Sequence, residues 1–261
     1  AILDCNLDMN YFFGINDAVF LSEIQIPIFK NNEPRSNNIS LYRANPSDNK
    51  WQIKKLEDKK ISSDFFLIKS NDYSNSDIFF LAYPNEIDYL SIDTLKNFNN
   101  FTETSPAYRA NLKIILRNGG FSSYQSEYPY SMIAKKGSIL SSVHSLANMD
   151  ADSNYIFIKN IYEKPIQKNF TAFLVNIKTK KIEEQFDIKT NFTNSLKLNK
   201  KLIKPEIFLF TKDFLGIPIY TSVKNKHVSF EHTHPPHEYI LSNNKFNIIR
   251  NLKEEVNEIT C

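Results

Sequence analysis

The residues best suited to chemistry are histidines gathered near the C-terminal end of the chain. Four of the five lie within eleven residues, at His227, His232, His234 and His237. If "KHVSFEHTH" (226–234) is a strand, His232 and His234 share one face, with Cα atoms roughly 6.5 to 7 Å apart. Two imidazoles at that spacing can bind one ion, and zinc and non-haem iron favour such ligands. The sequence therefore predicts a divalent metal site at this pair.

The residues that follow the pair offer a third metal ligand at a restricted distance. Pro235 and Pro236 end the strand, because proline cannot donate to a ladder of hydrogen bonds, and they stiffen the chain before His237 and Glu238. We expect the third ligand to be His237 or Glu238, with His144 in "SSVHSL" as the distant candidate.

Other interpretations of the histidine segment need no metal. Glu231 and Glu238 lie beside the histidines and could serve with them as general acid and base. The histidines could instead be hydrogen-bonded structural residues, because apolar side chains alternate on the same face as His232 and His234. An exposed pH-sensitive loop is the third option, since imidazole titrates near neutral pH.

The pattern His232-X-His234-X3-Glu238 resembles the first motif of the cupin family over these seven residues. This chain has Lys226 where that motif has a glycine. No histidine follows Glu238, so the second cupin motif, which needs a further histidine, has no counterpart. We therefore carry no cupin activity over to this chain.

A second candidate site is the aromatic segment "RNGGFSSYQSEYPYSM" (117–132), which begins with two adjacent glycines. Adjacent glycines mark a tight turn, so the tyrosines that follow are expected on a polar loop. Tyrosine rings with amide and carboxylate partners suit a sugar, which has flat apolar faces and hydroxyl groups. The predicted ligand contacts are Tyr124, Gln125, Glu127 and Tyr128, with Arg109 as a cationic contact. In the alternative, Tyr128 and Tyr130 pack inward.

The elements that must position these residues are mainly strands, because apolar residues recur with period two. Alternating runs separated by turn residues predict an all-β fold, an antiparallel β-sandwich in one or two domains, with a short C-terminal helix. The expected strands and hairpins lie at 19–29, 110–117, 154–162, 170–188 and 206–223, and short helices at 91–98 and 245–259. Asparagine is abundant and glycine is rare, so asparagine is expected at left-handed turn positions.

A domain boundary is expected near residues 100–106, which divides the chain into an N-terminal β domain (1–104) and a C-terminal β-sandwich domain (105–261) with the histidines. A single domain stays open as the alternative. Cys5 and Cys261 lie near opposite ends of the chain and could form a disulfide, although two free thiols are the simpler interpretation. A start at "AILDC" without Met leans towards export.

Composition narrows the classes of partner. The net charge of +3 is too small to indicate nucleic-acid binding. No run of about 18 apolar residues occurs, so no membrane-spanning helix is expected. Three functions remain: a metal-binding β-sandwich protein, with the option of a metal-dependent enzyme acting on a small polar or sugar-like ligand; a non-catalytic carbohydrate- or surface-binding module; and a structural β domain of a larger assembly.

Overall fold

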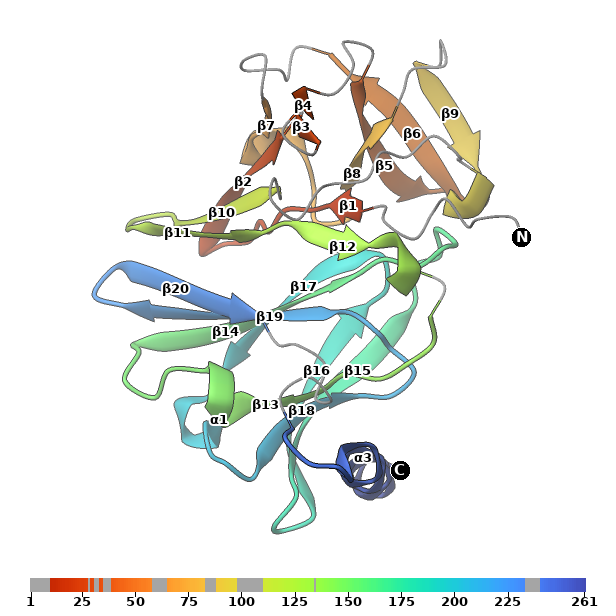
Figure 1. The fold of residues 1–261 in the computed structure, drawn as a ribbon. Coiled ribbons are helices and arrows are strands. Elements are labelled where there is room, and N and C mark those ends of the chain that lie inside the picture. Colours follow the sequence, from red (N-terminus) through yellow and green to blue (C-terminus); the bar gives the residue numbers. More distant parts are fainter. Residues whose placement is uncertain are drawn as a thin grey trace. The chain divides into compact units, whose positions relative to one another are not determined.

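The computed structural model describes residues 10–27, 29–30, 33–34, 39–57, 65–82, 88–97, 110–133, 135–232 and 240–261. The chain divides into two compact units. Unit 1 comprises Ala1–Lys135, Ile161–Gln167 and Asn191–Thr193, and unit 2 comprises Lys136–Asn160, Lys168–Thr190 and Asn194–Cys261. The described residues form mostly antiparallel sheets with a C-terminal helix (Figure 1), which confirms the predicted fold class.

The described residues of unit 1 form two larger antiparallel sheets and one two-stranded sheet. The six-stranded sheet has the order β12 (Glu127–Pro129), β1 (Asn10–Phe12), β8 (Ile78–Ala82), β5 (Ser40–Ser47), β6 (Lys50–Leu56) and β9 (Tyr89–Ile92). The four-stranded sheet has the order β11 (Phe121–Gln125), β10 (Asn111–Leu116), β2 (Phe20–Pro27) and β7 (Phe65–Ile68). The two-stranded sheet pairs β3 (Phe29–Lys30) with β4 (Glu33–Pro34).

Unit 2 is a sandwich of two four-stranded sheets. One sheet has the order β13 (Leu140–Ser142), β18 (Ile207–Thr211), β15 (Asn169–Asn176) and β16 (Lys181–Lys189). The other has the order β17 (Phe192–Leu198), β14 (Ser153–Asn160), β19 (Ile217–Lys224) and β20 (His227–His232). Both sheets contribute to one buried core, for example through Leu174 and Leu209 from the first and Ile156 and Tyr220 from the second.

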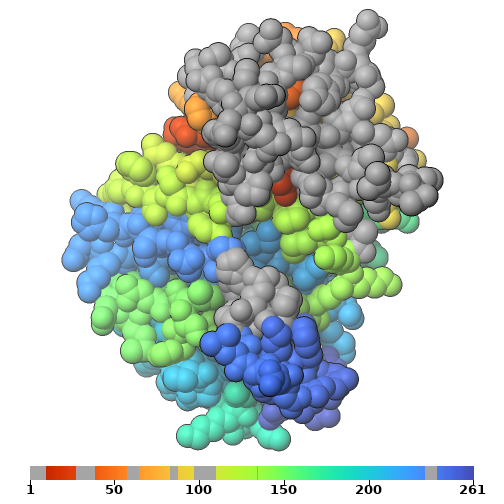
Figure 2. Space-filling model, viewed as in Figure 1, coloured from red at the N-terminus to blue at the C-terminus, as the bar shows by residue number. Residues whose placement is uncertain are grey.

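The C-terminal helix α3 (Lys245–Ile259) confirms the helix predicted at 245–259. Its apolar stripe, which includes Leu252, Val256 and Ile259, packs in a second cluster against Val175 and Phe210 of the sandwich. The helix lies on the surface of unit 2, where it is the dark blue segment of Figure 2. The sheet of β13, β18, β15 and β16 therefore has apolar contacts on both faces, with the sandwich core on one face and α3 on the other.

Left-handed turn positions are occupied without glycine, as the sequence predicts. Among the described residues, the non-glycine positions with positive φ are Asp48, Asn49, Lys180, Asn191, Asp213, Asn225 and Lys226, and no glycine has positive φ. Five of these seven are Asn or Asp, whose short polar side chains tolerate this region. The hairpin from β19 to β20 turns on two residues with positive φ, Asn225 and Lys226.

Several expected elements can be compared with the strand pairing. The hairpin predicted at 170–188 is confirmed, because β15 pairs with β16 around a turn at residues 177–180. The hairpin predicted at 206–223 is wrong, because β18 pairs with β13 and β15 whereas β19 pairs with β14 and β20. The helix expected at 91–98 is instead the end of β9 followed by a 3-10 turn at Leu95–Asn97.

The division into units differs in extent from the domain boundary expected near residues 100–106. Residues 101–109 lie outside the described residues. Beyond them, β10 pairs with β2, β11 pairs with β10 and β12 pairs with β1, all within unit 1. Segment Ile161–Gln167 also belongs to unit 1, where the Trp51 indole Nε1 donates to the Glu163 carbonyl at 2.9 Å. The predicted division into domains 1–104 and 105–261 stays a prediction.

The turn between β19 and β20 gives a test of the local backbone. Lys226 has φ of 67°, which a β-branched or long side chain adopts at a cost and glycine adopts freely. We predict that Lys226→Gly raises the free energy of unfolding by about 0.5–1 kcal/mol. Lys224→Gly, two residues earlier in the extended strand β19, should lower it by a similar amount. Thermal melts of both variants measure the two signs, and destabilisation by Lys226→Gly would contradict the turn.

Candidate functional site

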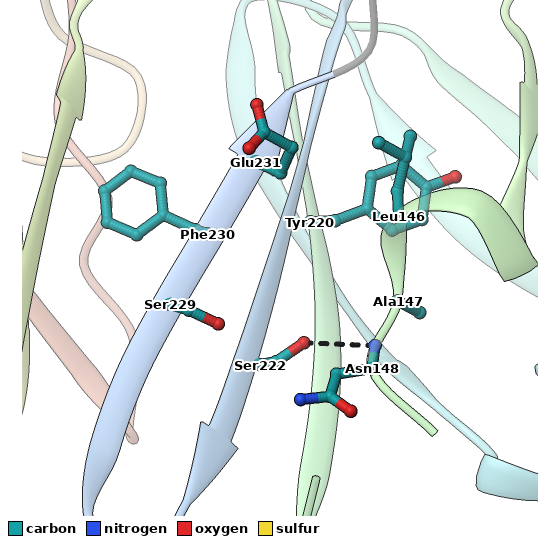
Figure 3. A pocket seen from close by; sticks show the side chains of 8 residues that line it. All are labelled: Leu146, Ala147, Asn148, Tyr220, Ser222, Ser229, Phe230 and Glu231. Carbon is teal, nitrogen blue, oxygen red and sulfur yellow. Dashed lines mark hydrogen bonds between the residues drawn. The ribbon is translucent and has the colours of Figure 1, made fainter. Parts of the chain in front are cut away.

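A pocket of about 150 Å³ lies in unit 2, between the strands β19 and β20 and the chain that follows helix α1 (Val143–Leu146). Figure 3 shows its lining residues, which come from three stretches of the chain: Leu146, Ala147 and Asn148; Tyr220 and Ser222; and Ser229, Phe230 and Glu231. All of them belong to unit 2.

The register of the β19–β20 hairpin gathers the polar residues of the pocket. Tyr220 is opposite Glu231 and Ser222 is opposite Ser229, so these four side chains share one face of the sheet. That face looks into the sandwich, since Tyr220 belongs to its core. Because β20 is the last strand in this sheet's order, Ser229 and Glu231 are exposed whereas their partners on β19 are buried. Figure 3 shows Phe230 directed to the other side of β20.

A buried amide holds the opposite wall of the pocket against β19. The side chain of Asn154, 2% exposed, accepts from the Asn148 backbone N–H at 3.0 Å and donates to the Asn148 carbonyl at 2.9 Å. The Ser222 hydroxyl also donates to the Asn154 oxygen, at 2.6 Å. The Asn148 N–H lies 3.4 Å from the Ser222 hydroxyl oxygen, the contact dashed in Figure 3. Strand β14 thereby fixes both Asn148 and Ser222.

The floor of the pocket is the ring of Tyr220, which is locked between the two sheets. Its hydroxyl lies 2.9 Å from the Ser141 hydroxyl of β13, within hydrogen-bonding distance, and both residues are buried. Leu146 and Ala147 pack against the same core and form an apolar wall. The pocket therefore combines an apolar wall and an aromatic floor with the exposed hydroxyl of Ser229 and the exposed carboxylate of Glu231.

The structure places the predicted metal ligands only in part. The alternation predicted for the histidine segment is confirmed from His227 to His232, where exposed and partly buried residues alternate. His232 is partly buried, and its Nδ1 lies 3.8 Å from Glu231 Oε1. His144 is exposed on α1. His234, His237 and Glu238 lie outside the described residues. Within the described ranges, no group of three or more His, Cys, Asp or Glu could hold a metal ion.

The aromatic segment is not the polar loop expected from its glycines, because it forms strands β11 and β12. Tyr124 and Gln125 end β11, and Glu127 accepts from the Ala110 backbone N–H at 3.1 Å. Tyr128 is fully buried, and this burial raises the pKa of its hydroxyl. It therefore offers no surface to a ligand, as the alternative interpretation expects. Arg109 lies outside the described residues.

Most residues of the pocket carry no signal in the sequence. Glu231 is a candidate acid or base there, whereas Tyr220, Ser222 and Asn148 belong to no motif. The available signal was the two-residue turn at Asn225 and Lys226, which fixes the register between β19 and β20. Cys261 is an exposed free thiol, and Cys5 lies outside the described residues.

No protein-family model matches the chain, and no curated protein or solved structure matches it either. In the part of the chain that the structure describes, no helix is long and apolar enough to cross a membrane. The assignment of the pocket therefore depends on its own geometry.

The Asn154 network gives a test of how the pocket is built. We predict that Asn154→Ala lowers the free energy of unfolding by about 1–3 kcal/mol, because it leaves the Asn148 backbone groups and the Ser222 hydroxyl without their buried partner. Urea denaturation measures the change. Ser229→Ala, at an exposed position on the same face, should stay within about 0.5 kcal/mol of the unmodified protein. Equal effects from the two variants would contradict the role of Asn154.

Proposed function

We propose that unit 2 is a non-catalytic binding module that holds one ring of a carbohydrate in the pocket. The observation that carries this proposal is the exposed Glu231 carboxylate, which lies beside the Ser229 hydroxyl and lines the same pocket as Tyr220 and Leu146. A sugar ring presents C–H groups on its faces and hydroxyls at its rim. The apolar wall and the aromatic floor suit the faces, and the carboxylate suits the hydroxyls.

The chemistry of the polar groups supports a hydroxylated ligand. An ionised carboxylate only accepts hydrogen bonds, and its two oxygens can accept from two neighbouring hydroxyls of one ring. A serine hydroxyl both donates and accepts, so Ser229 matches a further hydroxyl in either direction. Hydrogen bonds to a charged group are about twice as strong as those between neutral groups. Glu231 therefore supplies the largest single polar contribution available in the pocket.

The size of the pocket supports a single ring. Pockets for drug-sized ligands usually measure about 300–1,000 Å³. A cavity of about 150 Å³ in another protein accommodates benzene, so the same volume has room for one six-membered ring. The pocket volume of about 150 Å³ is therefore better matched to one sugar unit than to a larger cofactor.

The set of lining residues supports binding over hydrolysis. Glycoside hydrolysis normally uses two carboxyl groups, about 5 to 9.5 Å apart across the bond that is cleaved. Among the residues that line the pocket, Glu231 carries the one carboxylate. We therefore propose Glu231 as a ligand-binding residue, in place of the acid or base role expected from the sequence.

Sugar binding can be tested with a panel of neutral monosaccharides, by ligand-observed NMR followed by calorimetric titration. We predict that the protein binds at least one of them and that Glu231→Gln weakens binding about tenfold or more, because it removes the charge from the acceptor. Ala147→Phe should abolish binding, since the larger side chain fills the pocket. Glu254→Gln, at an exposed position on α3, is the matched control and should bind normally.

Two results would overturn this assignment. One is a folded protein that binds no monosaccharide of the panel. The other is binding that survives Ala147→Phe unchanged while the variant remains folded by circular dichroism.

A metal-binding function is the second candidate, and the placement of His232 favours it. His232 lies at the end of β20 and its imidazole is near the Glu231 carboxylate, so a nitrogen and an oxygen ligand are already adjacent. Zinc or iron bound there would need further ligands from the sequence-predicted set, His234, His237 or Glu238. Neutral imidazole is required of a ligand, so metal affinity should fall below about pH 6.5.

Elemental analysis of protein purified without a histidine tag tests the metal proposal. We predict about one zinc or iron per chain after dialysis, a higher melting temperature with the metal, and loss of both in His232→Ala. His227→Ala is the control, because His227 lies on the opposite face of the same strand. Less than about 0.1 metal per chain, with no thermal shift, would rule the site out.

A further inference from the structure

The outer face of the four-stranded sheet in unit 1 carries aligned rows of side chains, most of them polar. None of these side chains lines the pocket. On β2 and β10 the inward residues, such as Ile24, Leu112 and Ile114, are buried. The residues between them point to the opposite face, because side chains alternate along a strand. This opposite face of β2, β10 and β11 is called the platform below.

Strand register arranges the platform into three rows, each with one residue from each strand. The first row is apolar and holds Leu21, Ile115 and Phe121. The second holds Glu23, Lys113 and Ser123. The third consists of the amides Gln25, Asn111 and Gln125. Neighbouring strands lie about 4.8 Å apart and successive rows about 7 Å apart, so the amides form a ladder across three strands.

The aromatic ring of the apolar row is exposed and held in place. Phe121 is 61% exposed, and the Lys113 Nζ lies 4.4 Å from the centroid of its ring. Lys113 Nζ is also 3.6 Å from Glu23 Oε2, so the positive charge is paired within its own row. A cation over a ring fixes the ring through attraction to its electron-rich face. The second row therefore orients Phe121 and leaves the platform close to neutral.

The residue types on the platform indicate the chemistry of its partner. Amide side chains both donate and accept hydrogen bonds, which matches hydroxyl groups better than charged or purely apolar groups. Phe121 lies exposed in one row with Leu21 and Ile115, so this row offers an apolar surface that the C–H face of a sugar can cover. Nucleic acid requires several cations free to neutralise phosphates, whereas Lys113 is paired with Glu23. An apolar protein partner would desolvate the amides of Gln25 and Asn111 without supplying hydrogen bonds to them.

We propose that the platform binds an extended, uncharged polysaccharide chain. One sugar stacks on the exposed Phe121 ring, and sugars further along the chain exchange hydrogen bonds with Gln25, Asn111 and Gln125. The proposal goes beyond the single-ring pocket and stands independently of it, because the two sites share no residue and lie in different units.

The experiment uses the full chain and neutral hexasaccharides of β-1,4-linked glucose, xylose, mannose and N-acetylglucosamine, with a sulfated heparin hexasaccharide as the charged probe. We expect the protein to bind at least one neutral hexasaccharide by calorimetry, at least tenfold more tightly than the corresponding monosaccharide and than heparin. Phe121→Ala should weaken that binding about tenfold. The matched control is Tyr89→Ala on β9, another ring 61% exposed in unit 1 but on the other sheet.

A second variant keeps the proposal testable if Phe121→Ala fails to fold. Gln25→Ala changes an exposed side chain of the amide row and should weaken hexasaccharide binding three- to fivefold. Absence of binding to every neutral hexasaccharide would overturn the platform, as would unchanged affinity in both platform variants. Loss of hexasaccharide binding in Glu231→Gln, with normal binding in Phe121→Ala, would place the chain in the pocket and also overturn the platform.

Discussion

The pocket of unit 2 depends on the buried amide of Asn154. This side chain satisfies both backbone groups of Asn148, so the chain after α1 cannot move away from the sheet without leaving buried polar groups unpaired. The same stretch also fixes the neighbouring turn, because Asp152 donates its N–H to the Val223 carbonyl and accepts from the Asn225 N–H, both at 2.8 Å. One stretch of chain therefore sets the wall of the pocket and the hairpin that carries Glu231.

The edge strands β16 and β20 of the sandwich each carry a glutamate on the face directed into the sandwich, Glu184 and Glu231. The two glutamates differ in how far they are exposed to solvent. Glu184 on the last strand, β16, is partly buried, and desolvation raises its pKa, so its charge carries a cost that discourages pairing of the edge with another chain. The Glu231 side chain on β20 is 65% exposed. An exposed carboxylate in a pocket is better placed to accept hydrogen bonds from a ligand than to guard an edge.

Local patterns predict the strands of this chain, whereas the crossings between sheets depend on distant residues. Alternation is sufficient for His227–His232 and for the hairpin of β15 and β16, because period two is a property of neighbouring residues. The stretch from Asp213 to Gly216 has the composition of a tight turn, yet it connects two sheets. Gly216 passes so close to β14 that an added Cβ would lie 2.6 Å from the Lys159 carbonyl oxygen. That contact spans 57 positions in the sequence, and no local pattern records it.

The two proposed sites differ in the same way, because the platform depends on patterns within strands and the pocket depends on contacts between distant residues. The alternation in "FSSYQ" (121–125) is enough to direct Phe121 and Gln125 to one face once β11 is recognised as a strand. The adjacent glycines instead predict a loop, in which Gln125 is an expected ligand contact together with Tyr124 and Tyr128. The platform needs only the register of three antiparallel strands. The pocket needs two strands, a helix end and a buried amide at the same time, so it is more sensitive to local loosening of the fold. A site built on register alone is therefore the easier of the two to predict from a single sequence.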